Sequence, residues 1–166
     1  MTRKNPKITI ITVVKNSERY IEQNIKSLIN QSYQNYEHII VDGFSTDKTM
    51  EIVNKYKSKI HKIISEKDNG LYDAMNKGIK NSTGDIIGIL NSDDYFNVDA
   101  LKIVKNYFED SPKINFLFGS VIKHKLLHGF YPWKIYWTFG FYTAHSVGFF
   151  IKKESQLKIG YYNLKK

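Results

Sequence analysis

The sequence predicts an α/β fold in which helices flank a mainly parallel central sheet. Short β-branched runs of strand length alternate with segments whose apolar residues recur at helical spacing, and this alternation is typical of a parallel sheet covered on both faces. Polar residues, several of them carboxylates, follow directly after the apolar runs, at the strand ends where such sheets bind ligands. The chain has 166 residues, 42% of them hydrophobic, and no linker or repeat. We therefore expect a single domain over residues 1–166.

The first half of the chain predicts three strands and two helices. The run ITIITVV, residues 8–14, is β-branched throughout and predicts a buried strand. A helix is expected from Ser17, a residue suited to cap a helix. Its apolar residues recur at helical spacing: Ile21, Ile25, Leu28 and Ile29. The run YEHIIV, residues 36–41, predicts a second strand, and residues 60–64 predict a short third one. The helix between them is marked by Met50, Val53 and Tyr56.

The second half predicts two helices and two strands. Its clearest helix covers residues 71–81, where the apolar positions follow the i, i+3, i+4, i+7, i+8 pattern of a helix face. These positions are Leu71, Ala74, Met75, Gly78 and Ile79. The run DIIGIL, residues 85–90, predicts a fourth strand, and a further strand is expected near residues 115–121. The helix between these two strands is marked by Leu101, Val104 and Phe108.

Composition narrows the class of protein. No apolar run reaches the length of about 18 residues that a membrane span needs, and the start, MTRKNPKITI, is unlike a signal peptide, so a cytoplasmic protein is expected. The chain has no cysteine, so any metal would bind to oxygen or imidazole. The net charge of +9 comes from 25 basic and 16 acidic residues. The basic residues are scattered lysines for the most part, so no nucleic-acid partner is expected.

The stretch GILNSDDYF places Asp93 and Asp94 directly after the predicted fourth strand. Two carboxylates at a strand end suit Mg²⁺ or Mn²⁺, which take few protein carboxylates and complete their coordination with substrate phosphate oxygens. The alternative is that either aspartate caps the following helix, since a carboxylate can accept from the free N–H groups of a first turn. The stretch alone leaves both interpretations open.

Other polar groups are further candidates for a ligand site, and each also has a structural interpretation. Asp42 also follows a predicted strand, and it stands either in a ligand site or in a turn. Asp68 and Gly70 form a turn by composition, and Asp73 lies on one face of the next helix. His145 lies between aromatic runs, either as a partly buried side chain or as a base or ligand. The sequence lacks a Gly-x-Ser-x-Gly elbow, a Gly-x-Gly-x-x-Gly fingerprint and a phosphate loop, which leaves metal-assisted phosphate chemistry.

Two long segments, read in order, resemble the family 2 glycosyltransferases, which have the GT-A fold. They are "TVVKNSERYIEQNIKSLINQSYQNYEHIIVDGFSTDKT" and "SEKDNGLYDAMNKGIKNSTGDIIGILNSDDYF", and a weaker match continues through "AHSVGFFIKKESQLKIGYYN". The resemblance implies transfer of a hexose from a nucleotide sugar, expected to be a UDP-sugar, to a glycan or lipid-linked acceptor with inversion. It also implies a nucleotide-binding part over about residues 7–95 and an acceptor-side part over about residues 96–166.

The resemblance assigns expected roles to individual residues. The loop that lines the nucleotide base, and the acidic residue that holds base or ribose, correspond to Thr12, Val14, Asn16 and Asp42. The segment near the donor sugar and diphosphate corresponds to Asp68, Gly70 and Asp73. The metal-binding Asp-x-Asp position corresponds to Asn91, Ser92 and Asp93. Asp93 is the expected ligand of a Mn²⁺ or Mg²⁺ ion, with Asp94 assisting, and His145 is an acceptor-side candidate. The family's Asp-Asp-Gly-Ser is Asp-Gly-Phe-Ser here, so Phe44 replaces a glycine.

One part of the family pattern is missing from the sequence. Inverting members use a carboxylate base shortly after a Gly-Gly-Phe/Tyr-Asp/Asn segment, which here resembles IGYYN, and no Asp or Glu follows Glu154. The expectation is therefore either a piece of a longer enzyme or a donor-binding module that lacks the base. The aromatic residues in 130–150 are expected to stack on sugars, to meet the inner face of a membrane together with nearby lysines, or simply to cover the sheet.

Overall fold

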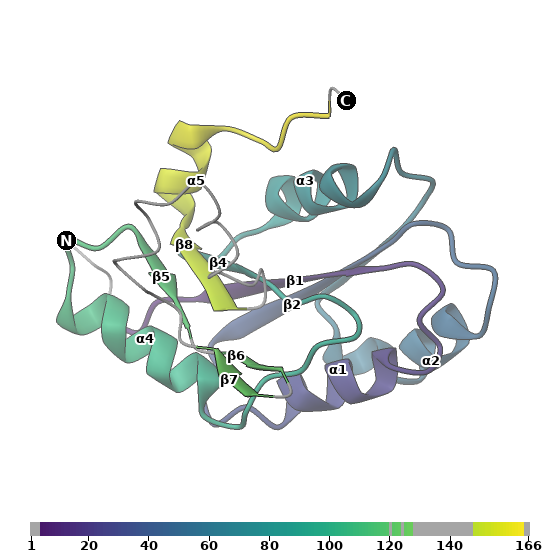
Figure 1. The fold of residues 1–166 in the computed structure, drawn as a ribbon, viewed down its shortest axis with the longest axis horizontal. Helices are drawn as coiled ribbons and strands as arrows, with labels where there is room; N and C mark the ends of the chain where they lie inside the picture. Colours follow the sequence, from purple (N-terminus) through teal and green to yellow (C-terminus); the bar gives the residue numbers. More distant parts are fainter. Residues whose placement is uncertain (1–3, 120, 124, 128–147, 165–166) are drawn as a thin grey trace.

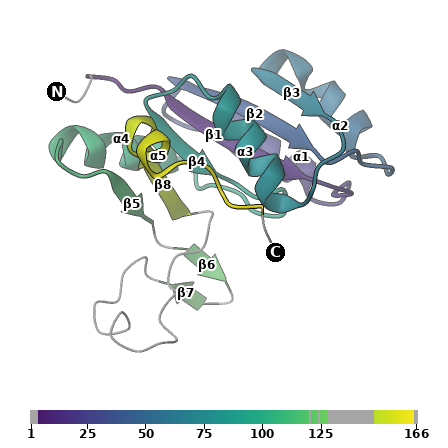
Figure 2. The ribbon, with the colours of Figure 1, turned by 90° about the horizontal axis from the view of Figure 1, so that it is seen from above.

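A six-stranded sheet forms the centre of the computed structural model, which describes residues 4–119, 121–123, 125–127 and 148–164 (Figure 1). The strands lie in the order β3-β2-β1-β4-β8-β5. Their bounds are β1 Ile8–Val14, β2 Tyr36–Asp42, β3 Lys62–Ser65, β4 Ile86–Ile89, β5 Phe116–Phe118 and β8 Phe149–Lys152. A separate hairpin, β6 Val121–Lys123 and β7 Lys125–Leu127, lies beside the sheet (Figure 2).

The sheet is mainly parallel, as predicted. β1 pairs in parallel with both β2 and β4, and β2 pairs in parallel with β3. β8 runs antiparallel to both of its neighbours, β4 and β5. The sequence does not predict β8, because its residues belong to the aromatic stretch without a clean period.

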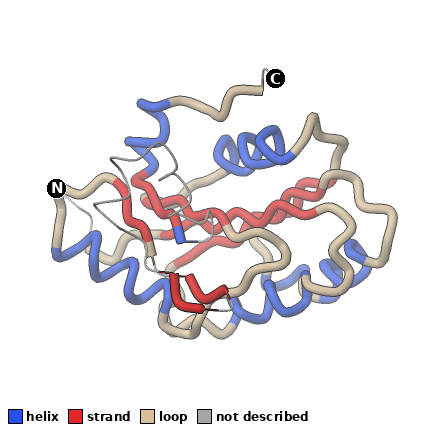
Figure 3. Tube along the Cα trace, viewed as in Figure 1, coloured by secondary structure: helices blue, strands red, loops and turns tan. Residues whose placement is uncertain are grey.

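The helices form two layers around the sheet (Figures 1 and 3). Their bounds are α1 Ile21–Ile29, α2 Thr49–Lys55, α3 Leu71–Asn81, α4 Ala100–Asp110 and α5 Lys153–Ile159, with a short 3₁₀ helix at Lys57–Lys59. One face of the sheet packs against α1, α2 and α4 through buried residues such as Ile25, Val53 and Phe108. α3 packs on the other face through Ala74, Met75 and Ile79. The three buried clusters explain the apolar periodicities in the sequence.

The contact between α3 and β1 is unusually close because it is made at a glycine. A Cβ atom built on Gly78 would lie 2.3 Å from Cγ2 of Ile11, a distance that no packed side chain tolerates. The glycine therefore lets α3 lie directly on the middle of the sheet. The first turn of α3 lies at the edge where β1 and β4 end.

Most element predictions are confirmed, with one error at a helix end. The predicted helix over residues 71–81 coincides with α3, and β3 lies slightly later than predicted. Ser17 is not the N-cap of α1: the helix begins at Ile21 after Tyr20, with no side-chain cap. The backbone C=O of Ser17 instead accepts from the N–H groups of Tyr20 and Ile21 in a turn before the helix.

Some expectations concern residues that the structure does not describe. His145 and most of residues 130–150 lie outside the described residues, so the three interpretations of the aromatic stretch stay predictions. Within the described residues, none of the helices combines the length and apolar character that crossing a bilayer requires.

Candidate functional site

A pocket of about 450 Å³ lies at the edge of the sheet where β1 and β4 end. This size is typical of small-molecule sites. Three separate segments line it: the end of β1 and the residue after it, the turn leading into α3, and the turn after β4. The lining residues are Val13, Val14, Lys15, Asp68, Gly70, Leu71, Ala74, Asn91, Ser92 and Asp93.

Six of the predicted site residues meet in this pocket: Val14, Asp68, Gly70, Asn91, Ser92 and Asp93. Five others lie in the sheet, its loops or the first turn of α3 but do not line the pocket: Thr12, Asn16, Asp42, Asp73 and Asp94. The remaining candidate, His145, is outside the described residues.

Asp93 and Asp94 do not cap the helix that follows them, so the capping interpretation is wrong. α4 begins only at Ala100, and its N-cap residue is Asp99. A tight turn holds the two aspartates instead: the N–H of Asp94 donates to the C=O of Asn91 at 3.0 Å, and the Asn91 side-chain amide donates to Asp94 Oδ2 at 3.2 Å. Asp93, at the centre of this turn, is exposed and borders the pocket.

The turn is also tied to the loop after β1. The hydroxyl oxygens of Ser92 and Ser17 lie 2.7 Å apart and share a hydrogen bond. Ser92 is largely buried while still bordering the pocket. The walls formed by the β1 and β4 loops are therefore connected directly.

The wall formed by the start of α3 depends on Gly70. This residue has φ +106°, a conformation that side chains disfavour. Its N–H donates to Asp68 Oδ1 at 3.0 Å. Asp73 Oδ2 accepts from the N–H of Asn69 at 2.9 Å, and this hydrogen bond, together with the nearby Lys77 charge, lowers the pKa of Asp73. Asp73 therefore shapes the turn, and Asp68 borders the pocket.

Asp42 and Asn16 organise the loops behind the pocket. Asp42 is fully buried, and its carboxylate accepts from the N–H and hydroxyl of Ser45 and from the hydroxyl of Ser65. Asn16 has φ +51°, and its side-chain oxygen accepts from the N–H of Thr46 at 2.8 Å. In this structure both side chains make loop-to-loop hydrogen bonds at the carboxyl ends of β1 and β2.

Phe44, which stands where the family pattern has a glycine, takes a positive φ that glycine adopts more readily than other residues. Its φ is +63° and its side chain is 56% exposed. The preceding Gly43 lies against Asp68, since a Cβ there would be 2.3 Å from Asp68 Oδ2. The close approach at Gly43 fixes the loop, and Phe44 bears a left-handed conformation that costs a non-glycine residue about 1–2 kcal/mol.

Phe44→Gly is expected to stabilise the protein relative to Phe44→Ala, by about 1 kcal/mol, because glycine tolerates positive φ and alanine does not. Both changes remove the same exposed ring, so alanine is the matched control. Urea unfolding of the two variants measures the difference. Equal stabilities would show that the loop relaxes away from positive φ when the ring is removed.

Thr12 does not face the pocket, contrary to the expectation that it lines the site. It is fully buried, and its hydroxyl lies between His38 Nε2, at 2.9 Å, and Asn24 Oδ1, at 3.2 Å. In a strand, alternate side chains point to opposite faces. Thr12 thus points to the α1 side of the sheet, whereas Val13 lies on the α3 side.

Lys15 is a pocket residue that sequence reasoning did not single out. It follows β1, is exposed, and lies beside Gly43 at the pocket wall. It is the cationic side chain among the lining residues, where Asp68 and Asp93 are the anionic ones. Its position directly after the first strand could have identified it, but lysines are so frequent in this sequence that one more did not stand out.

The donor groups at the pocket fit a divalent cation that takes most of its ligands from a substrate. In the part of the chain that the structure describes, no three histidine or acidic side chains form a group able to hold a metal ion. Asp93 borders the pocket and Asp94 follows it in the same turn. Mg²⁺ and Mn²⁺ are commonly held by one or two carboxylates together with phosphate oxygens and water, so this donor set suits such an ion.

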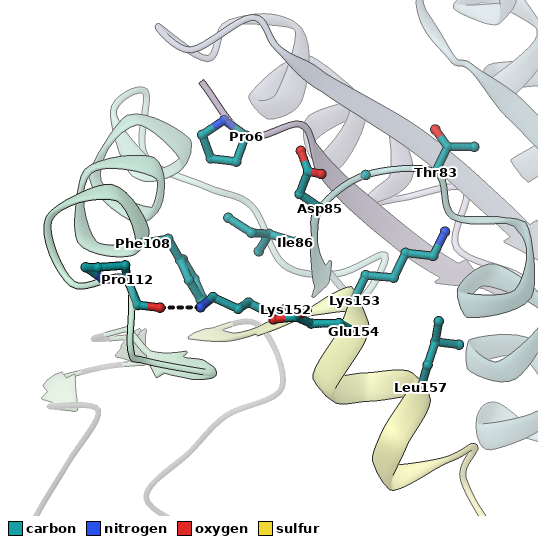
Figure 4. A pocket seen from close by; sticks show the side chains of 11 residues that line it. Pro6, Thr83, Asp85, Ile86, Phe108, Pro112, Lys152, Lys153, Glu154 and Leu157 are labelled. Carbon is teal, nitrogen blue, oxygen red and sulfur yellow. Dashed lines mark hydrogen bonds between the residues drawn. The ribbon is translucent and has the colours of Figure 1, made fainter. Parts of the chain in front are cut away.

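A second cavity, of about 500 Å³, lies at the opposite edge of the sheet, near the starts of β1 and β4 (Figure 4). Three of its charged side chains are hydrogen-bonded to the chain itself. Lys152 Nζ donates to the C=O of Pro112 and Lys153 Nζ to that of Ser82, each at 2.6 Å. Asp85 Oδ2 accepts from the N–H of Lys7 at 2.8 Å. The cavity is slightly larger, but the carboxylate turn lies at the other edge, so we place the functional site there.

Comparison with known proteins identifies relatives of the chain. The chain is 35% identical over 105 residues to the putative teichuronic acid biosynthesis glycosyltransferase TuaG of Bacillus subtilis, a match that covers 61% of the chain and 42% of TuaG. It is 31% identical to Staphylococcus aureus TarS 1–349, whose structure in complex with UDP-GlcNAc matches 63% of the chain and 31% of that structure with a TM-score of 0.59. The chain spans less than half the length of the curated relatives that it matches.

A third comparison concerns the fold alone. The mannosyltransferase PcManGT of Pyrobaculum calidifontis, solved with GDP-Man and Mn²⁺, matches 96% of the chain and 48% of that structure, with a TM-score of 0.75 and 19% identity. The mixed sheet and its two helical layers are thus those of the GT-A glycosyltransferases. The profile "Glycosyl transferase family 2" matches residues 9–157, and the chain belongs to this family.

Proposed function

We propose that this chain is the donor-binding part of a metal-dependent glycosyltransferase, which transfers a hexose from a UDP-sugar to an acceptor hydroxyl with inversion. The observation that carries the proposal is the position of Asp93, exposed on a turn at the carboxyl edge of the sheet and bordering the same pocket as Lys15 and Gly70. A nucleoside diphosphate needs charge neutralisation, which Lys15 and a cation at Asp93 would supply, and the start of α3 at Gly70 is a helix end that favours negative charge.

Each pocket residue has a distinct task in this proposal. Asp93, with Asp94 beside it, would hold Mn²⁺ or Mg²⁺, and the bound ion would supply the charge neutralisation that makes a nucleoside diphosphate a competent leaving group. Lys15 adds a positive charge to the wall formed by the end of β1. Gly70 opens α3 with a backbone that can approach a phosphate closely, at the helix end that favours negative charge.

The named relatives support a UDP-sugar donor and a glycan acceptor. TarS has been solved with UDP and with UDP-GlcNAc, and its name describes transfer of N-acetylglucosamine to poly(ribitol-phosphate). TuaG is named for teichuronic acid biosynthesis. By analogy we propose that the acceptor is a glycan or lipid-linked saccharide of polysaccharide biosynthesis. From the aromatic residues and lysines of the sequence we also propose that the protein works at the cytoplasmic face of the membrane.

The test is a thermal-shift screen of nucleotide sugars with and without Mn²⁺. A ligand that binds only the native state raises its stability, by about 2.7 kcal/mol when its concentration is 100 times its Kd. We expect UDP and at least one UDP-sugar to raise the melting temperature in the presence of Mn²⁺, and GDP-mannose to do so less. If no nucleotide sugar gave a Mn²⁺-dependent shift, the proposal would fail.

A further inference from the structure

The loop between β4 and α4, residues 90–99, is held along its length by side chains of α1 and of the residues just after it. Ser27 Oγ accepts from the N–H of Phe96 at 3.2 Å. Gln31 donates to the C=O of Asn97 at 2.8 Å and accepts from the N–H of Leu101 at 3.0 Å. The backbone groups of an irregular segment need such hydrogen-bond partners when they are buried. Side chains on this side of α1 therefore hold the loop in its conformation.

Asn24 holds the part of the loop that contains Asp93. It is fully buried in α1, and its amide nitrogen donates to the C=O of Asn91 at 2.8 Å and to that of Asp94 at 2.9 Å. These two carbonyls bracket the turn on either side of Ser92 and Asp93. Both N–H bonds of one side-chain amide are therefore used to fix the two ends of the turn.

The orientation of the Asn24 amide is fixed from behind by Thr12. Asn24 Oδ1 can only accept, so the Thr12 hydroxyl must donate to it. Thr12 has one hydroxyl proton, so the bond between Thr12 Oγ1 and His38 Nε2 must be donated by the histidine. Burial and, secondarily, the charge of His61 lower the pKa of His38 to about 3, so its ring is neutral and carries one N–H.

We propose that Asn24 is a positioning residue for the candidate metal and donor site, with Thr12 and His38 fixing the direction in which its amide points. The chain of bonds runs from His38 to Thr12, from Thr12 to Asn24, and from Asn24 to the two carbonyls of the turn. Asn24 itself is buried away from the pocket lining. It acts by keeping the turn in the conformation that presents Asp93, and this role rests on the proposed function.

The test compares Asn24→Leu with Gln31→Leu. Each removes a buried amide that donates to two backbone carbonyls, and only the first touches the turn with Asp93. We expect both variants to melt at lower temperature. Measured by calorimetry below the melting range, only Asn24→Leu should lower the affinity for UDP in the presence of Mn²⁺, by about 10- to 100-fold, the usual effect of losing a group that orients a metal ligand. UDP affinity without Mn²⁺ should be unchanged.

Hydrogen exchange of residues 91–96 is the second readout, because it does not depend on ligand binding. The N–H of Asp94 is hydrogen-bonded inside the turn, and its exchange should be faster in Asn24→Leu than in Gln31→Leu. Equal exchange in the two variants, or wild-type Mn²⁺-dependent UDP affinity in folded Asn24→Leu, would overturn the positioning role. If the wild-type protein shows no Mn²⁺-dependent UDP binding, the proposed function fails, and the exchange rates still decide whether Asn24 holds the turn.

Thr12→Val covers the case in which Asn24→Leu does not fold. Valine keeps the shape of the β-branched side chain and removes only the hydroxyl that orients Asn24. We expect a smaller loss of the same Mn²⁺-dependent UDP affinity, together with faster exchange of residues 91–96. Unchanged affinity and unchanged exchange in this variant would also overturn the proposal.

Discussion

Asp93→Ala is expected to abolish the Mn²⁺-dependent part of UDP binding, with a loss in affinity of about 100-fold or more. In the described part of the chain, Asp93 is one of two carboxylates that border the pocket, and the other, Asp68, accepts from the N–H of Gly70. A cation that depends on so few protein oxygens cannot lose one without losing most of its affinity. Titration calorimetry of UDP with and without Mn²⁺ measures the effect.

The same variant should fold as stably as the wild type, because Asp93 is exposed. Asp110→Ala, at the exposed end of α4, is the control for loss of one surface carboxylate. We expect its UDP affinity to match the wild type under both conditions. Undiminished Mn²⁺-dependent affinity in Asp93→Ala would show that the cation binds elsewhere.

Much of the fold could be predicted because the residues that become buried recur at regular spacing in the sequence. A strand buried on both faces, such as β1, must be apolar or β-branched at every position, and a helix on one face of a sheet, such as α3, must be apolar at every third or fourth. The sequence of β8 shows no such regular spacing. Its short run of residues pairs with β4 and β5 in the opposite direction, and an aromatic stretch does not encode strand direction.

The site was predictable at the level of strand ends and less so at the level of side chains. The order of strands in a parallel sheet brings their carboxyl ends to one edge, which placed Asp93 and Val14 correctly in one pocket. Whether a side chain borders the pocket depends on how close to the end of the strand it lies. Thr12, inside β1, hydrogen-bonds to Asn24. Val14, at the end of β1, and Lys15, just after it, border the pocket. The sequence alone does not distinguish a residue that binds a ligand from one that holds the loop behind it.

Asp42 illustrates the same limit. Its position at the end of the predicted second strand suggested a ligand contact, and the structure shows a fully buried carboxylate hydrogen-bonded to Ser45 and Ser65. A short polar motif at a strand end is needed to build the loop as well as to bind a ligand. Both needs select the same residue types, so the motif predicts the location of the site more reliably than it predicts each contact.

A single buried carboxylate at the opposite edge of the sheet has a structural role. Glu37 in β2 is 5% exposed. Its carboxylate accepts from Lys7 Nζ at 2.8 Å, from the Thr9 hydroxyl at 2.5 Å, and from the hydroxyl of Thr83 at 2.5 Å. The backbone N–H groups of Thr83 and Gly84 also donate to it. The carboxylate thus joins β1, β2 and the turn before β4.

The pKa of Glu37 reflects these bonds. Burial by itself raises the pKa, but the hydrogen bonds from Lys7, Thr83 and Thr9 outweigh it and lower the pKa from 4.5 to about 2. Because the folded-state pKa lies below the unfolded one, the ionised carboxylate stabilises the fold above pH 4.5, and this contribution is lost as the pH falls towards 2. A shift of this size corresponds to on the order of 3 kcal/mol.

Glu37→Gln is therefore expected to lower the free energy of unfolding at pH 7 by about 2–4 kcal/mol, since it removes the charge and turns an amide group towards backbone donors. The difference from the wild type should shrink steadily as the pH is lowered from 5 to 3, because the wild-type carboxylate itself becomes protonated more readily on unfolding. Urea unfolding at each pH measures both effects.

The matched control is Glu51→Gln, which removes the same charge from an exposed i,i+4 pair with Lys55 in α2. Exposed pairs of this kind contribute little, so we expect a change within about 0.5 kcal/mol at every pH. A wild-type minus Glu37→Gln difference that stayed constant between pH 7 and pH 3 would mean that the loss comes from packing. In that case the side chain would stabilise the fold by packing, and its charge would contribute nothing to the free energy of unfolding.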